Sequence, residues 1–132
     1  MRYMMLMIPG GYADAPPDAK PDAEAMETMM RYNKALGEAG VLVALDGLYP
    51  PSAGARVTFN TGKPVVADGP FAETKDVLGG YWMLKVGSRE EAIAWARRCP
   101  AGENDTLELR QVFEMAEAPE QIQQLAVELG ID

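Results

Sequence analysis

The chain has 132 residues, with 12 Lys and Arg against 20 Asp and Glu, a formal net charge of −8 and a pI near 4.5. This length predicts a single domain over residues 1–132. An acidic surface repels phosphate backbones and anionic headgroups, so we expect no direct nucleic-acid partner. The sequence has no signal peptide and no apolar run of ~20 residues, so we expect no membrane partner and a cytoplasmic protein.

Histidine is absent, and Cys99 is the single cysteine. The absence of histidine excludes His-based catalytic triads, most zinc sites and the usual general base near neutral pH. One cysteine cannot form an intrachain disulfide, which fits a reducing compartment. We expect Cys99 to have no catalytic role, and we expect no metal and no cofactor. Any acid–base chemistry would then depend on Asp, Glu, Tyr, Lys or Cys.

The first part of the chain predicts a strand, a loop, a helix and a second strand. Residues 2–8 (RYMMLMI) are almost continuously apolar, as in a central strand. A segment rich in Pro, Ala and Asp follows, and a helix is predicted over residues 23–39. Its stripe of Met26, Met29, Met30 and Leu36 predicts packing on a sheet. Residues 41–48 (VLVALDGL) predict the second strand.

The second part begins with a hairpin over residues 55–68 that turns at Thr61–Gly62, followed by a strand over residues 80–86. Ser88 and Glu91 form a capping box that starts a helix. The helix places four residues on one face: Ala92, Trp95, Ala96 and Cys99. Residues 106–115 alternate, with Leu107, Leu109, Phe113 and Met115 on one side. A short amphipathic helix over residues 119–129 ends the chain.

This order of elements predicts an α+β fold of ferredoxin-like type, in which two βαβ halves interleave around an inserted hairpin. The core would span residues 1–115, with the helix at 119–129 added to it. Helices would cover only one face of the sheet. The other face would be apolar and uncovered, so we expect a homodimer packed sheet to sheet. The C-terminal helix would extend that interface or cap a sheet edge.

The segment DGPFAETKDVLGGYWML, residues 68–84, resembles the DGPF family within the YCII-related superfamily. The matching positions are Asp68–Phe71, Glu73, Lys75 and Gly79–Tyr81. The opening MRYMMLMI and the LDGLYPP of residues 45–51 are also similar to that family. The resemblance implies a dimeric α+β barrel with a cleft, and an association with extracytoplasmic-function sigma factors. In the wider superfamily the resemblance also implies a His and an Asp that act together. Asp68 stands at the position of that Asp, but the chain has no histidine to pair with it.

Asp68 has two interpretations. In the first, its carboxylate accepts backbone N–H bonds in an Asx-turn through Gly69 and Pro70. In the second, a rigid turn holds the carboxylate at a cleft, where it acts as a catalytic acid–base group or as an anchor. An ordinary Asp has a pKa near ~3.9, so a base at neutral pH needs strong desolvation, which Phe71 and Tyr81 could supply.

The remaining candidates are residues that could bind a substrate beside Asp68. The Gly79–Gly80 backbone could donate N–H groups, and Tyr3 and Tyr81 could present hydroxyls. Arg56 could balance an acidic cleft or bind an anion. The full set of candidate binding residues is Tyr3, Asp46, Arg56, Gly69, Pro70, Phe71, Glu73, Lys75, Gly79, Gly80 and Tyr81. For Asp46, Glu73 and Lys75, a turn or a solvated ion pair is the simpler explanation.

Two functions from different classes follow. The first is an enzyme or binder that takes an unidentified small molecule in a cleft at Asp68. The second is a non-catalytic dimeric module that presents its Pro-rich loop and C-terminal helix to a protein, for which a sigma factor is the partner implied by the resemblance. A pocket holding Asp68 would favour the first function. An Asp68 saturated by turn amides would favour the second.

Overall fold

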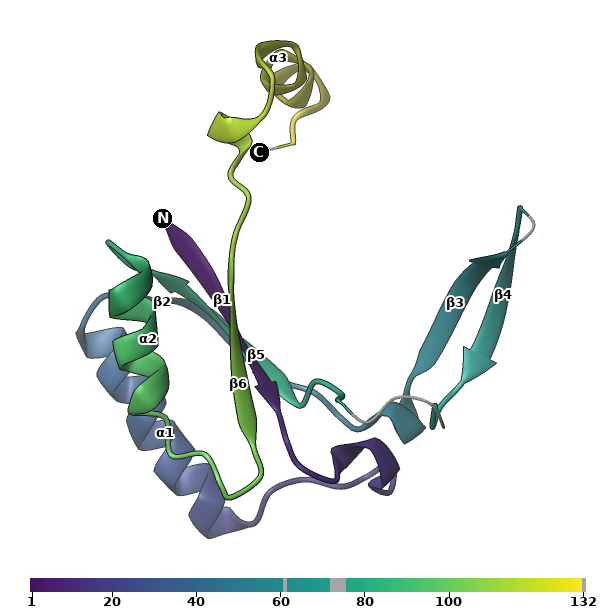
Figure 1. The fold of residues 1–132 in the computed structure, drawn as a ribbon, viewed down its shortest axis with the longest axis vertical. Helices are drawn as coiled ribbons and strands as arrows, with labels where there is room; N and C mark the ends of the chain where they lie inside the picture. The colour runs from purple at the N-terminus through teal and green to yellow at the C-terminus, as the bar shows by residue number, and fades with distance from the viewer. Residues whose placement is uncertain (61, 72–75, 132) are drawn as a thin grey trace.

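The computed structural model describes residues 1–60, 62–71 and 76–131 and has an α+β architecture (Figure 1). Its body is a four-stranded antiparallel sheet in the order β2-β5-β1-β6. The sheet strands are β1 (Arg2–Ile8), β2 (Leu42–Gly47), β5 (Gly80–Lys85) and β6 (Thr106–Gln111). The helices are α1 (Ala23–Glu38), α2 (Arg89–Arg97) and α3 (Glu120–Leu129). A separate two-stranded hairpin consists of β3 (Ala55–Asn60) and β4 (Lys63–Asp68).

The strand order interleaves two βαβ units. β5 lies between β1 and β2, and β1 lies between β5 and β6, with every neighbouring pair antiparallel. The registers place Leu6 opposite both Tyr81 and Glu108, and Asp46 opposite Tyr81. This interleaving is the one expected of a ferredoxin-like sheet.

The core lies between the sheet and the two helices α1 and α2, which pack on the same face (Figure 1). Buried and half-buried residues alternate along β1, so every second side chain points at the helices. The Tyr32 ring meets the Trp82 ring edge-on at 6.0 Å between centroids. The Tyr32 hydroxyl donates to the Trp95 carbonyl at 2.7 Å, and Trp82 Nε1 donates to Asn33 Oδ1 at 2.8 Å. The polar groups of Tyr32 and Trp82 are therefore satisfied.

Three details of the sequence prediction were wrong. Met26 and Met30 are 50% and 67% exposed, because α1 turns Tyr32 to the sheet beside Leu36, which packs on the sheet as predicted. β6 ends at Gln111, so the expected alternation stops and leaves Phe113 and Met115 exposed. The capping box of α2 is only half formed: Ser88 Oγ accepts from the Glu91 N–H, but the Glu91 carboxylate accepts from Gly87 rather than from Ser88.

The hairpin and α3 both stand away from the sheet, at opposite ends of it (Figure 1). The described residues of β3 and β4 are all exposed. The path to α3 is fixed to β1 by Arg2, whose guanidinium makes two bonds of 2.8 and 2.9 Å to the Glu114 carboxylate. α3 ends at Gly130, which has the left-handed φ of 69°. In the described part of the chain, no helix combines the length and apolar character needed to cross a bilayer.

Candidate functional site

The candidate site lies at the end of the sheet where β1 and β2 end and β5 begins. Gly79 and Gly80 form its floor, because side chains do not fit there: a Cβ on Gly79 would overlap the Pro9 ring, and one on Gly80 would lie 2.9 Å from the Asp46 carbonyl oxygen. The Gly79 N–H donates to the Met7 carbonyl at 2.8 Å. This N–H is therefore used by the sheet and is not available to a ligand.

Tyr81 and Asp46 form a hydrogen-bonded pair beside this floor, on the sheet face opposite the helices. The Tyr81 hydroxyl donates to Asp46 Oδ2 at 2.7 Å across the β2–β5 ladder. This hydrogen bond, together with the Asp46 charge, raises the pKa of Tyr81. Tyr81 is therefore a neutral phenol at physiological pH and can act as a proton donor rather than as a base.

Tyr12 and Tyr49 add two further phenols, which the sequence reasoning missed. The Tyr12 hydroxyl donates to the Leu48 carbonyl at 2.5 Å, and the Leu48 N–H donates to the Gly79 carbonyl at 2.9 Å. Burial and the neighbouring Tyr49 raise the pKa of Tyr12. Tyr49 is 64% exposed. The sequence did offer a signal for both residues: each is a tyrosine in the loop that directly follows a strand, Tyr12 after β1 and Tyr49 after β2.

The Asp68–Phe71 segment is a turn packed against the one-turn helix Pro51–Ala53. The Gly69 N–H donates to the Gly54 carbonyl at 2.9 Å, and a Cβ on Gly69 would overlap the Pro51 carbonyl oxygen. The Gly69–Pro70 peptide bond is cis. The segment is thus shaped by the close approach of two backbones, for which glycine is required.

The charged and aromatic side chains at this turn are only loosely engaged. The Arg56 guanidinium stacks over the Phe71 ring at 4.0 Å, a cation–π contact. The Asp68 carboxylate is exposed and accepts no hydrogen bond from the residues that the structure describes. Among the described residues, no backbone N–H makes the hydrogen bond to the carboxylate that the Asx-turn interpretation requires, and no other side chain there pairs with its charge.

All but one of the predicted site residues that the structure describes fall into two groups. Asp46, Gly79, Gly80 and Tyr81 come together at the end of the sheet, while Arg56, Asp68, Gly69, Pro70 and Phe71 come together at the hairpin base. Tyr3 belongs to neither group, because it is 6% exposed and points into the core beneath the helices. Side chains alternate along β1, and Leu6 lies opposite Tyr81, so Tyr3 points to the other face of the sheet. Glu73 and Lys75 lie outside the described residues.

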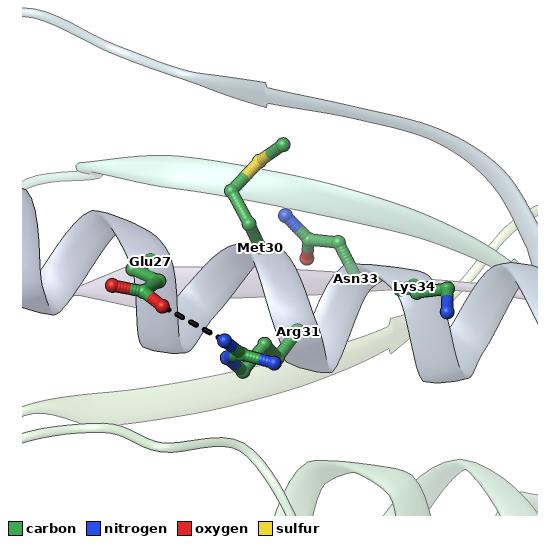
Figure 2. A pocket seen from close by; sticks show the side chains of 5 residues that line it. All are labelled: Glu27, Met30, Arg31, Asn33 and Lys34. Atoms are coloured by element: carbon green, nitrogen blue, oxygen red, sulfur yellow. Dashed lines mark hydrogen bonds and ion pairs between the residues drawn. The ribbon is translucent and has the colours of Figure 1, made fainter.

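Two hollows lie elsewhere on the described part of the chain. One of about 430 Å³ lies on α1 and is lined by Glu27, Met30, Arg31, Asn33 and Lys34 (Figure 2). Figure 2 shows the 2.8 Å ion pair between Glu27 and Arg31 beside it. A second hollow, of about 200 Å³, lies at Gln111–Phe113 and Glu117. Neither of these two hollows contains a residue of the candidate site.

Cys99 and the acidic residues add no reactive centre among the described residues. Burial raises the pKa of the half-buried Cys99 thiol to about 11, which leaves little thiolate at neutral pH. Over the same part of the chain, no cluster of three or more Asp, Glu or Cys side chains is placed to hold a metal ion. The described ionisable groups at the end of the sheet are phenols and a carboxylate: Tyr12, Tyr49, Tyr81 and Asp46.

The sequence model of the YCII-related domain matches residues 1–116. The chain belongs to the YCII-related family. An uncharacterized protein of Rhizobium meliloti (strain 1021) is 36% identical over 76 residues, which cover 58% of this chain and 61% of that protein. The match thus spans less than two thirds of that relative. The YCII-related domain contains the whole four-stranded sheet and the candidate site, whereas α3 lies beyond residue 116.

Proposed function

We propose that this YCII-related protein is a homodimer that binds a small polar molecule at the Asp46–Tyr81 pair. The observation that carries the proposal is the 2.7 Å hydrogen bond between the two side chains on the uncovered face of the sheet. A carboxylate and a phenol held together on a rigid two-strand ladder form a pre-organised polar site. Structural packing does not require this pair, because Asp46 is exposed.

The polar groups favour a ligand that donates hydrogen bonds. Asp46 presents carboxylate oxygens, which are acceptors, and it uses one of them for Tyr81. Asp68 offers a second exposed carboxylate at the hairpin base. Exposed Tyr49 supplies an aromatic surface next to Leu48. An amine or a polyhydroxylated molecule with a small apolar part fits this set better than an anion does.

The phenols favour binding and proton donation over base catalysis. Both Tyr12 and Tyr81 have raised pKa values, and both hydroxyls already donate to fixed acceptors. A catalytic base at neutral pH would have to be a carboxylate with a strongly raised pKa, which requires burial. Asp46 and Asp68 are exposed. We therefore place binding first and catalysis second.

A second copy of the chain would form the other wall of the site. The uncovered face of the sheet carries Met4, Leu6 and Ile8 along β1 and Met83 on β5. α1 and α2 cover only the opposite face. Packing this face on its equivalent in a partner would remove apolar surface from water, at ~25 cal/mol per Å². Tyr81 lies opposite Leu6 on this face, so the partner would enclose the Asp46–Tyr81 pair. This is the dimeric α+β barrel arrangement, and the Asp68–Phe71 motif supports the DGPF subtype.

The alternative is a non-catalytic dimeric module that binds a protein, with an extracytoplasmic-function sigma factor as the implied partner. The exposed apolar residues of α3, which lies outside the YCII-related domain, favour it. In that case the Asp46–Tyr81 pair would have no ligand. Substitution of Asp46 or Tyr81 would therefore weaken ligand binding if the first function is right and would have no such effect if the second is right.

The test is a ligand screen with variants of the pair. Wild type would be screened against amines, polyols, carboxylates and phenols by saturation-transfer NMR, with Tyr81→Phe, Asp46→Asn and a control, Asp18→Asn, in the exposed loop. We expect hits among amines or polyols whose affinity falls at least about tenfold in both site variants and stays unchanged in the control. Hits that bind all four proteins equally would reject the site.

Sedimentation velocity of the wild type over a range of concentrations tests the dimer separately. We expect the dimer at micromolar concentration. A monomer at all concentrations would contradict the two-walled site.

A further inference from the structure

The hairpin has one apolar face and one polar face. In the β3–β4 register, Val57 pairs with Val66 and Phe59 with Pro64, and directly paired residues share a face. Arg56, Thr58 and Asn60 lie on the other face. Val57, Phe59 and Val66 are 51%, 75% and 66% exposed. An isolated two-stranded hairpin is marginally stable in water, so this apolar face needs a cover.

α3 has an uncovered apolar stripe. Ile122, Leu125 and Leu129 follow helical spacing, and they are 43%, 44% and 61% exposed. The helix has only 10 residues, and a helix this short is marginal in water without tertiary packing. Ala126 is the buried residue of the helix, and Gln123 ties the start of the helix to the preceding segment by donating to the Ala116 and Ala118 carbonyls.

The two uncovered surfaces lie at opposite ends of the sheet and cannot meet within one chain (Figure 1). The hairpin leaves from the Gly47 and Gly80 ends of β2 and β5, beside Ile8 at the end of β1. The path to α3 leaves beside Arg2, at the start of β1. In a dimer with facing sheets, a two-fold axis perpendicular to β1 would place the hairpin of one copy beside α3 of the other.

We propose that α3 of one copy packs on the apolar face of the β3–β4 hairpin of a second copy, and that symmetry repeats this contact. The inference rests on the homodimer proposed above. It goes beyond that dimer because α3 lies outside the YCII-related domain. The two symmetry-related hairpin–helix contacts together would make a two-fold symmetric interface, so the assembly would close at two copies.

Charge disfavours the main alternative, in which two α3 helices pack on each other. Residues 112–132 carry the acidic residues Glu114, Glu117, Glu120, Glu128 and Asp132 and no basic residue. The hairpin carries Arg56, Lys63 and Asp68, a net charge of +1. Arg56 and Lys63 lie on the face away from Val57 and Val66, and Asp68 lies at the base of the apolar face. Two α3 helices packed on each other would bring together two acidic segments, which disfavours that alternative, whereas the apolar face of the hairpin carries a single acidic residue at its base.

Charge substitution with matched controls tests the contact. Val66→Glu on the apolar face is compared with Val65→Glu on the polar face, two neighbouring valines that are 66% and 56% exposed. Leu125→Glu in the α3 stripe is compared with Val127→Glu on the far side of the same helix. We expect Val66→Glu and Leu125→Glu each to raise the dimer dissociation constant at least about tenfold, and the two controls to change it little. Equal effects within each pair would overturn the proposal.

Disulfide trapping identifies the partner surface directly. In the background of Cys99→Ala, which removes the native thiol, Val66→Cys, Leu125→Cys and the double variant would be oxidised and run on non-reducing gels. We expect a covalent dimer from the double variant and little from either single variant, since a disulfide requires Cα atoms within ~7 Å.

The outcomes separate this inference from the dimer itself. Trapping of Leu125→Cys alone would show α3 paired with α3 and overturn the proposal. A protein that sediments as a dimer but is not trapped in the double variant, or in the equivalent pair Val57→Cys with Ile122→Cys, would overturn the hairpin contact and leave the dimer standing. A protein that sediments as a monomer would overturn both.

Discussion

The Tyr81 hydroxyl lies 2.7 Å from Asp46 Oδ2, in a pair that joins β5 to β2 at the end of the sheet. The hydrogen bond is made by the neutral phenol, so it raises the pKa of Tyr81 above its ordinary value of 10.0. If Asp46 did not contact Tyr81, it would not raise the pKa of Tyr81 through a hydrogen bond. The pair can therefore be detected by titration without any knowledge of the ligand.

We expect Asp46→Asn to lower the pKa of Tyr81, because the charged acceptor is removed. The measurement is an ultraviolet difference titration of phenolate absorbance, with Tyr81→Phe used to assign the signal. A folded-state pKa above the unfolded value contributes stability that is present below pH 10 and is lost as the pH rises through the folded pKa. An unchanged titration in Asp46→Asn would show that the two side chains do not interact in solution.

The Arg2–Glu114 pair gives a pH dependence of the opposite sign. The hydrogen bond from Arg2 lowers the pKa of Glu114 below its ordinary value of 4.5. The stability from this pair is therefore present above pH 4.5 and lost as the pH falls through the lower folded value. We expect Glu114→Gln to destabilise the protein at neutral pH and to converge with wild type in acid, measured by urea unfolding over a pH series.

Glu38→Gln is the matched control, since Glu38 pairs with Lys34 within α1 alone. A single-helix pair leaves the path to α3 untouched. A Glu114→Gln variant as stable as wild type at every pH would contradict the role of this pair in fixing that path.

Asp68→Asn tests whether the turn depends on the Asp68 charge. The carboxylate has no partner among the described residues, so we expect the free energy of unfolding to change by less than ~0.5 kcal/mol at matched protein concentration. Asp105→Asn is the comparison, since Asp105 accepts from the Gly10 and Gly102 N–H groups at 3.0 and 2.8 Å. We expect that change to cost about 1–3 kcal/mol. A similar cost for Asp68→Asn would restore the turn interpretation.

Local patterns in the sequence were sufficient to predict where the main strands and helices occur. The apolar run Arg2–Ile8 became the central strand β1, and Ser88 capped α2 through the Glu91 N–H as its spacing predicts. The predicted buried stripe of α1 was partly wrong, because its three methionines and one leucine are compatible with either of two adjacent faces of the helix. Only the sheet decides that Tyr32 faces inward and Met30 outward.

The candidate site depended on contacts between residues far apart in the sequence. Asp46–Gly47 has the composition of a turn, yet Asp46 lies in β2, and its partner Tyr81 is 35 residues away. Tyr12 sits in a loop of ordinary composition and gains its role from Leu48, 36 residues away. Propensity describes a residue and its neighbours, whereas these hydrogen bonds depend on strand register, which is a property of the whole sheet.

Gly69 gives the sharpest test of how the hairpin base is packed. A Cβ at this position would overlap the Pro51 carbonyl oxygen, which belongs to backbone and cannot rotate away. We expect Gly69→Ala to cost about 1–3 kcal/mol of unfolding free energy, because the turn must separate from the Pro51–Ala53 helix. Gly37→Ala is the matched control.

Gly37 lies inside α1, and a Cβ there meets nothing within 4 Å. Alanine favours helix over glycine, so we expect Gly37→Ala to stabilise the protein by about 0.5–1 kcal/mol. Urea unfolding of both variants at equal concentration measures the difference. If Gly69→Ala were as stable as wild type, the close approach of Gly69 to Pro51 would be absent in solution, and the hairpin would be free to swing on its base.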